Sequence, residues 1–235
     1  MKAKGLRDII IWLIDHLTDT QVNGAENIPT EGGLLICTNH MSRLDIPVLF
    51  TNPKRAKITA LVTTKYLKYP LLRWFIVTAE GIWLDRDTAD FAAIHKAIEK
   101  LDEGYAVGIS PEGTRSSTCQ LLEAKPGAAM LALRAQVPIQ PVALIGTEIA
   151  TDELKHLRKP HIRVEYGKLI QTPKLDRNDR EGQLKWLTTE IMCQIAAMMP
   201  EKYHGFYKNH PRLLEILAEC ENPPHAPEMI SIIHE

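Results

Sequence analysis

Residues 34–45 have the sequence Leu34-Leu35-Ile36-Cys37-Thr38-Asn39-His40-Met41-Ser42-Arg43-Leu44-Asp45. The first five form a short apolar run with the length of a strand, and polar residues follow it at once. A continuous apolar run is typical of a strand that helices bury on both faces, as in parallel sheets. The polar residues would then lie at the carboxyl end of the strand, where α/β sheets bind their ligands. This stretch predicts an α/β fold with a site beside His40.

The alternation of strands and helices continues along the chain. Further strands are expected at 58–63, 81–84, 106–109, 137–145 and 162–166. Helices are expected at 44–50, 89–102, 127–136 and 179–199. This order favours a layered α/β/α domain with a central mixed, largely parallel sheet. We assign the domain to residues 26–210, preceded by an amphipathic helix and connector at 1–25 and followed by a C-terminal helix and loose tail at 211–235.

The first helix, expected within residues 1–19, is amphipathic. Its apolar residues recur with a period near 3.6, at Leu6, Ile9, Ile10, Leu13, Ile14 and Leu17. The apolar stretch is much shorter than the about 20 residues that span a bilayer, and no small-residue cleavage site of a secretory signal follows it. Two interpretations stay open: the stripe packs on the protein's own core, or it lies on a membrane surface.

Composition argues against several classes of protein. Of 235 residues, 45% are hydrophobic and 24% are charged, a balance that can fill a core. The 28 basic and 29 acidic residues give a net charge of -1, without the basic excess of a nucleic-acid binder. The four cysteines and nine histidines lack the spacing of metal ligands. We therefore expect no nucleic acid, no metal ion, and reduced, buried thiols in a cytoplasmic protein.

His40 and Asp45 lie five residues apart, just after the apolar strand. A neutral imidazole can take a proton from an alcohol, and a nearby carboxylate fixes its tautomer and stabilises the imidazolium. This spacing also arises by chance, so the pair taken alone has an ordinary structural interpretation.

A second polar cluster follows the strand expected at 106–109. It has the sequence Ser110-Pro111-Glu112-Gly113-Thr114-Arg115-Ser116. Such a turn can present backbone amides and a guanidinium to a phosphate, which the guanidinium binds with two hydrogen bonds. Any one of these residues is common in turns, but the whole string at a strand exit indicates an anion site.

Four segments in this order resemble the glycerolipid acyltransferase family, in its 1-acylglycerol-3-phosphate acyltransferase branch. They are Asn39 to Asp45 with its His-x4-Asp pattern, Gly81 to Arg86, Pro111 to Ser116 and Val137 to Val142. Lys125 to Gly127 and Met199 to Tyr207 are also similar to family sequence, so the resemblance covers about residues 22–207. The chain departs from the pattern at Ile109-Ser110, where many relatives carry an aromatic residue, and at His204, where arginine is common.

The resemblance implies roles for the catalytic pair. His40 would be the general base that deprotonates the acceptor hydroxyl, and Asp45 would orient it. The oxygen would then attack the thioester carbonyl directly, without an acyl-enzyme.

The resemblance also implies a set of binding residues. Arg86 and Arg115 would hold the acceptor phosphate. Apart from the resemblance, Lys65 is a further basic residue that could reach this phosphate. Glu112 would bind the acceptor's hydroxyl or glycerol portion. The neighbours of Glu112 in the same motif, Gly113 and Thr114, would let the backbone approach and complete the site, and Pro138 with its neighbours would shape the acyl pocket.

The expected acceptor is a lysophospholipid, foremost 1-acyl-sn-glycerol-3-phosphate, and the donor is acyl-CoA or acyl-ACP, bound as a substrate with no permanent cofactor. Because the chain lacks the long hydrophobic N-terminal segment of many relatives, we expect peripheral association with the inner face of the membrane. Basic residues alternate with aromatic ones within 65–77, a mixture that can bind anionic headgroups.

Other functions stay open at this point. Within the enzyme class, the alternative acceptors are another lysolipid, a glycolipid or an acylated amino acid. Ser110 could act with His40 and Asp45 as a lipid hydrolase, although Gly108 to Glu112 lacks the second glycine of a nucleophile elbow. A non-catalytic lipid-binding protein is the third alternative. The acyltransferase interpretation requires that His40 and Arg115 share one cleft.

Overall fold

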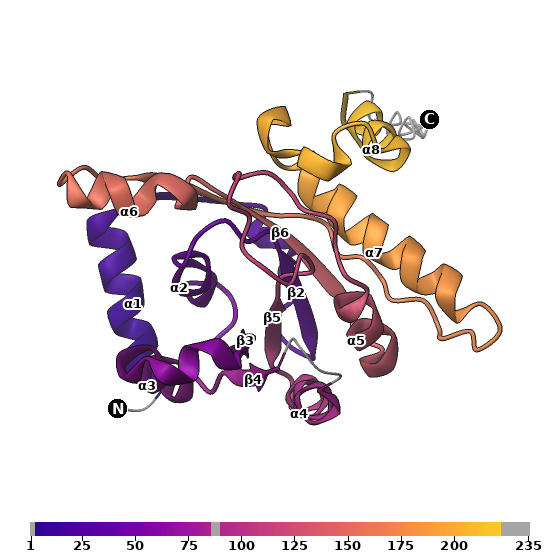
Figure 1. The fold of residues 1–235 in the computed structure, drawn as a ribbon, viewed down its shortest axis with the longest axis horizontal. Helices are drawn as coiled ribbons and strands as arrows, with labels where there is room; N and C mark the ends of the chain where they lie inside the picture. The colour runs from indigo at the N-terminus through magenta and orange to yellow at the C-terminus, as the bar shows by residue number, and fades with distance from the viewer. Residues whose placement is uncertain (1–2, 86–89, 222–235) are drawn as a thin grey trace, which may run out of the picture.

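The computed structural model describes residues 3–85 and 90–221 (Figure 1). Its centre is a seven-stranded sheet with the strand order β1-β7-β6-β2-β5-β3-β4. The strands are β1 (Asp19–Asn23), β2 (Leu34–Thr38), β3 (Ile58–Thr63), β4 (Ile82–Leu84), β5 (Ala106–Ile109), β6 (Ile139–Ile145) and β7 (His161–Tyr166). Neighbouring strands pair in parallel, except for the antiparallel pair β6 and β7. The prediction of a mixed, largely parallel sheet is confirmed.

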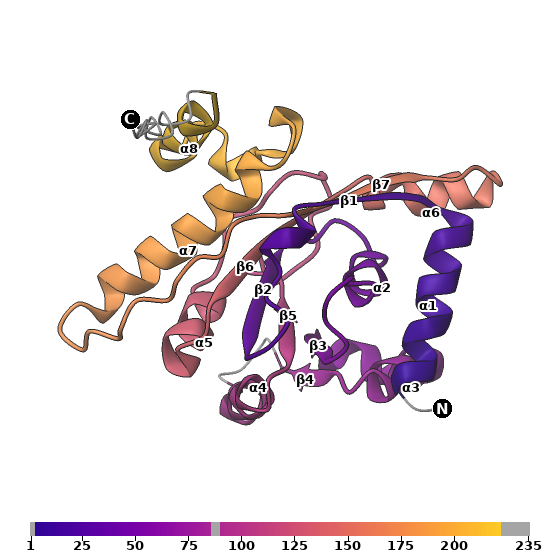
Figure 2. The same cartoon turned by 180° about the vertical axis from the view of Figure 1, so that it is seen from behind.

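Helices cover both faces of this sheet. They are α1 (Ala3–Leu17), α2 (Asp45–Phe50), α3 (Pro70–Thr78), α4 (Phe91–Asp102), α5 (Gly127–Ala135), α6 (Thr147–Lys155), α7 (Arg180–Ala197) and α8 (Pro211–Glu221). Short 3-10 helices lie at Ala25–Asn27, Thr64–Lys68, Glu201–Tyr203 and Gly205–Tyr207. In Figures 1 and 2, α4, α5 and α7 lie on one side of the sheet, and α1 and α2 lie on the other.

Strand β2 shows why the fold has three layers. All five of its residues are buried. Leu35 and Cys37 pack into the cluster that α4, α5 and α7 complete, whereas Leu34 and Ile36 pack into the cluster with α1 and α2. Successive side chains of a strand point to opposite faces, so a continuous apolar run needs helices on both.

The apolar stripe of α1 is divided between protein and solvent. Leu6, Ile10 and Ile14 are buried against the sheet side. Ile9, Leu13 and Leu17 are 47%, 39% and 46% exposed, and Trp12 beside them is 57% exposed. The protein's own core thus occupies only one half of the stripe. None of the helices in residues 3–85 and 90–221 is long and apolar enough to cross a bilayer.

One strand and two helices of the fold escaped prediction, among them α3, which lies in the mixed basic and aromatic segment. β1 lies within the segment 1–25, where only a helix and connector were expected, and it pairs with β7 at the edge of the sheet. α6 follows β6 directly, after Gly146, whose φ is +89°. Arg86 and the proline-rich tail at 223–227 lie outside the described residues.

Arg55 ties together the turns that precede β2 and β5. It is 2% exposed, and its guanidinium donates hydrogen bonds of 2.6–3.0 Å to four carbonyl oxygens, those of Pro29, Glu31, Gly32 and Gly104. The first three belong to the connector before β2, and the fourth belongs to the turn before β5. Arg55 therefore holds the entries of two neighbouring central strands.

We expect the substitution Arg55→Ala to lower the free energy of unfolding by about 2–4 kcal/mol, because buried carbonyls lose a charged donor. Arg158→Ala is the matched control: the side chain of Arg158 is 64% exposed in its pair with Glu153, and we expect a change within about 0.5 kcal/mol. Urea unfolding measures both. Equal midpoints for the two variants would contradict the role of Arg55.

Candidate active site

The site lies where the central strands β2, β5 and β6 end. The side chain of Asn39, which is fully buried, joins two of these ends. Its amide donates to the carbonyl of Leu144 at 2.8 Å, and its carbonyl oxygen accepts from the backbone amide of Leu144 at 2.8 Å. The Asn39 side chain thus forms the same pair of hydrogen bonds with Leu144 that a residue of a neighbouring strand would form. This contact fixes the position of the next residue relative to β6.

That next residue is His40, and it contacts Asp45. The distance between His40 Nδ1 and Asp45 Oδ2 is 2.7 Å. Asp45 is 1% exposed, and the same oxygen accepts the backbone amides of Met41 and Ser42, each at 2.8 Å. An ionised carboxylate only accepts hydrogen bonds, so the proton of the imidazole belongs on Nδ1. Nε2 is then left with a lone pair that can accept a proton.

The other oxygen of Asp45 has a partner from a distant part of the chain. The hydroxyl of Thr147, the first residue of α6, donates to Asp45 Oδ1 at 2.6 Å. Thr147 is fully buried. The sequence carried no signal for this contact, because the two residues lie 102 positions apart.

Glu112, for which the resemblance implied a contact with the acceptor, is held between two backbone amides. It is 2% exposed, and its two carboxylate oxygens accept the backbone amides of His40 at 2.9 Å and Leu122 at 2.8 Å. Burial is the main cause that raises the pKa of Glu112 to about 7, and the charge of Asp45 adds to it, although both amide donors act in the opposite direction. Glu112 therefore holds the loop after β5 against the backbone of His40.

A cleft of about 400 Å³ opens above His40. Its lining includes the predicted residues Lys65, Gly113, Thr114 and Arg115. It also includes three basic residues that were not predicted to bind substrate, namely Arg43, Lys68 and Lys125. His40 and Arg115 thus share one cleft, as the acyltransferase interpretation requires.

Gly113 has a steric reason to be glycine. Its φ is +70°, a conformation that residues with side chains rarely adopt. A Cβ atom there would also lie 3.3 Å from Lys125 Cδ. The turn therefore keeps the backbone close to Lys125 at the floor of the cleft.

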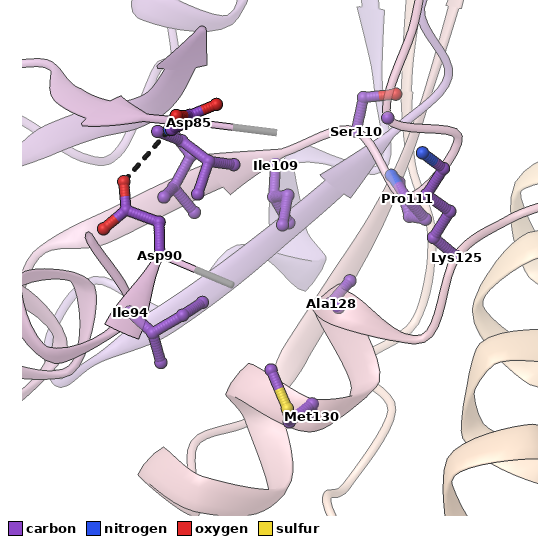
Figure 3. A pocket seen from close by; sticks show the side chains of 13 residues that line it. Asp85, Asp90, Ile94, Ile109, Ser110, Pro111, Lys125, Ala128 and Met130 are labelled. Carbon is purple, nitrogen blue, oxygen red and sulfur yellow. Dashed lines mark hydrogen bonds between the residues drawn. The ribbon is translucent and has the colours of Figure 1, made fainter. Parts of the chain in front are cut away.

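An apolar pocket of about 220 Å³ adjoins the cleft and shares Gly113 and Lys125 with it. Figure 3 shows Ile94, Ile109, Ala128 and Met130 around this pocket. At one end, the backbone amide of Asp85 donates to Asp90 at 3.0 Å. The pocket lies between α4 and the start of α5 and can take an alkyl chain.

The contribution of Pro138 to an acyl pocket stays a prediction, and the structure places this residue away from His40. Pro138 precedes β6, and its carbonyl accepts the amide of Leu35 at the beginning of β2. Because β2 and β6 are parallel, Pro138 lies at the opposite edge of the sheet from His40. Pro138 does not line the apolar pocket.

Ser110 does not complete a catalytic triad in this structure. It lines a small cavity of about 40 Å³ together with His40 and Asp45. Its buried hydroxyl has no hydrogen-bond partner among residues 3–85 and 90–221, so it is not bonded to the imidazole. In the same ranges, no group of three or more His, Cys, Asp or Glu side chains is arranged to hold a metal ion.

Comparison with known proteins agrees with this geometry. Residues 19–145 match the family described as Acyltransferase. Over 128 residues the chain is 31% identical to a 1-acyl-sn-glycerol-3-phosphate acyltransferase of Borreliella burgdorferi, covering 54% of this chain and 51% of that protein. It is 36% identical over 135 residues to the protein of the same name from Saccharomyces cerevisiae, covering 55% and 44%. The chain thus spans about half the length of these relatives.

A solved structure extends the likeness beyond these segments. The crystal structure of the 1-acyl-sn-glycerophosphate (LPA) acyltransferase PlsC from Thermotoga maritima superposes with a TM-score of 0.61 at 25% sequence identity. The likeness covers 80% of this chain and 78% of that one. The family match contains His40, Asp45 and Arg115 and ends just before Thr147. With the fold, the motifs and the paired side chains in agreement, the chain belongs to the acyltransferase family.

Proposed function

We propose that this protein transfers a fatty acyl group from acyl-CoA or acyl-ACP to the free hydroxyl of a lysophospholipid, with 1-acyl-sn-glycerol-3-phosphate as the acceptor and phosphatidic acid as the product. The observation that carries the proposal is the shared cleft: His40 and Arg115 line it together, and the apolar pocket opens from it. The curated relatives with this activity support the choice of acceptor.

In the proposed reaction, His40 Nε2 takes the proton of the acceptor hydroxyl while the oxygen attacks the thioester carbon. The tetrahedral intermediate then collapses, the carbon–sulfur bond breaks, and the leaving thiolate takes the proton back from the imidazolium. The hydrogen bond to Asp45 keeps the ring in the required tautomer and offsets its positive charge. No covalent acyl-enzyme forms.

The acceptor phosphate would bind to the basic side of the cleft. Arg115 offers a planar guanidinium, and Lys65 and Lys68 line the same cleft. Arg43 and Lys125 add two further cations, and Thr114 lies next to Arg115. We include Arg86 in this set from the resemblance alone. A phosphate held here leaves the hydroxyl of the same glycerol unit to approach the imidazole.

The acyl chain of the donor would enter the apolar pocket. Its walls are mostly apolar, although Asp85, Asp90 and Ser110 also line it, and it meets the cleft at Gly113 and Lys125. A chain in this pocket would place its thioester at the border between the two cavities, on the His40 side. The donor is a substrate that leaves as a free thiol, and no permanently bound cofactor takes part in the proposed reaction.

We further propose that the protein binds peripherally to the inner, cytoplasmic face of a membrane, where its lipid acceptor resides. The outer residues of α1 support this, because Ile9, Trp12 and Leu13 are exposed. On α3, Leu71 and Trp74 are 76% and 47% exposed. Exposed apolar residues beside basic ones are typical of helices that lie in the membrane interface.

The substitution His40→Ala should lower the rate of acyl transfer by at least about 100-fold, since the general base is lost, while the unfolding midpoint stays near that of the wild type. His161→Ala is the matched control, because His161 makes a similar 2.6 Å contact with Asp19 but its side chain is 82% exposed. Release of free thiol from acyl-CoA or acyl-ACP, with a lysophospholipid panel read by mass spectrometry, measures the rate. Turnover by His40→Ala within a few-fold of wild type would remove the proposed base.

The substitution Arg115→Ala should raise the acceptor KM roughly 10- to 100-fold, the effect of losing a hydrogen bond between two charged groups, and should change the donor KM much less. The acceptor KM of Arg115→Lys should lie between those of the wild type and Arg115→Ala, because lysine keeps the charge but cannot form two parallel hydrogen bonds to the phosphate. Arg158→Ala should change neither constant. Equal effects of Arg115→Ala on both substrates would argue against phosphate recognition by this residue.

The substitution Trp12→Asp should weaken binding to anionic phospholipid vesicles about 10-fold or more. The large apolar side chain of Trp12, which moves from water into the membrane interface on binding, is then replaced by a small charged one. Leu214→Asp, at a residue of α8 that is 54% exposed on another part of the protein, should leave vesicle binding unchanged. Co-sedimentation at one ionic strength compares the three proteins. Unchanged binding by Trp12→Asp would show that α1 does not contact the membrane.

A further inference from the structure

We propose that Thr147 is a positioning residue of the active site, which fixes the carboxylate of Asp45 and, through it, the tautomer of His40. The effect on turnover rests on the proposed function, whereas the effect on His40 itself does not. Thr147 lies outside the family match and outside every motif that the sequence singled out.

The argument begins with the uneven distribution of donors around Asp45. Oδ2 accepts three hydrogen bonds, from His40 Nδ1 and from the amides of Met41 and Ser42. Oδ1 accepts one, from the hydroxyl of Thr147 at 2.6 Å. Three donors thus stabilise the charge on Oδ2, whereas Oδ1 depends on a single donor. The contact with Thr147 completes the hydrogen bonding of the carboxylate.

Burial makes this single contact important. Asp45 is 1% exposed and Thr147 is fully buried, so bulk water does not reach the bond between them. Without the hydroxyl, Oδ1 would be a buried charged acceptor with no partner in the described protein, and such a group is costly. The carboxylate would then shift toward other donors, and this shift would weaken its bond to His40 Nδ1.

The backbone around Thr147 is itself fixed. Gly146 has a φ of +89°, and a Cβ atom there would lie 2.1 Å from the carbonyl oxygen of His161. The amide of Gly146 donates to Glu148 at 2.9 Å, and the other oxygen of Glu148 accepts the hydroxyl of Tyr203 at 2.6 Å. The two neighbours of Thr147, Gly146 and Glu148, are thus fixed by these contacts. They hold the backbone of Thr147 in the position from which its hydroxyl contacts Asp45.

The variant that tests the inference is Thr147→Val, which keeps the shape of the side chain and removes the hydroxyl. Thr147→Ser restores the hydroxyl. Thr59→Val is the matched control, because Thr59 is also fully buried and its hydroxyl donates to a carbonyl, that of Glu80, at 2.8 Å. Thr147→Ala takes the place of the valine variant if that protein does not fold.

The first measurement is the tautomer of His40, read from the ¹⁵N chemical shifts of its ring. We expect the Nδ1-protonated ring in the wild type, Thr147→Ser and Thr59→Val, and a clear population of the Nε2-protonated ring in Thr147→Val. The second measurement is acyl transfer, in which Thr147→Val should lower kcat about 10- to 100-fold with little change in either KM, and Thr147→Ser should recover most of it.

The outcomes separate the two proposals. A wild-type tautomer in Thr147→Val, or the same change in Thr59→Val, overturns the positioning role whatever the activity. A wild-type protein that transfers no acyl group to any lysophospholipid overturns the proposed function, and an altered tautomer in Thr147→Val then still supports the positioning role.

Discussion

The contact between His40 and Asp45 requires a carboxylate that stays charged while 1% exposed. Removing a carboxylate from water without compensation is costly, and the group would otherwise become neutral. This protein compensates with four donors to the two oxygens of Asp45, two from the backbone, one from the imidazole and one from Thr147. The loop after β2 and the start of α6 therefore have to meet at one point. Much of the local architecture follows from that demand.

The parallel sheet makes the meeting possible. Because β2, β5 and β6 run in the same direction, the segments that follow them emerge at one edge. Each segment contributes a different function: the segment after β2 brings the imidazole, that after β5 brings Arg115 and Glu112, and that after β6 brings Thr147. Side-chain contacts to backbone groups, such as those of Asn39 and Glu112, hold the segments to each other. The position of the imidazole therefore depends on all three segments, those that follow β2, β5 and β6.

The two cavities divide the chemistry of the proposed substrates between them. Several cations line the cleft at His40, and mostly apolar residues line the pocket beside it. The cleft suits a phosphate, because a phosphate needs charged hydrogen-bond donors. The pocket suits an alkyl chain, because burial removes its apolar surface from water. The imidazole lines the cleft, and Gly113 and Lys125 line both cavities. In the same way, α1 serves two environments, since half of its apolar stripe packs on the core and half is exposed.

The sequence by itself determined the alternating strands, the fold class, the placement of His40 and Asp45 after a buried strand, and the cluster that holds Arg115. These features are local: an apolar run, a helical period or a turn of glycine and polar residues is decided by neighbours in the chain. Only the tertiary structure decided that Glu112 holds the backbone of His40, 72 positions away, and that Thr147 reaches Asp45 across 102 positions. It also placed Pro138 at the far edge of the sheet and divided the stripe of α1. Strand order and the faces that helices cover set these contacts, and neither is written in the spacing of residues along the chain.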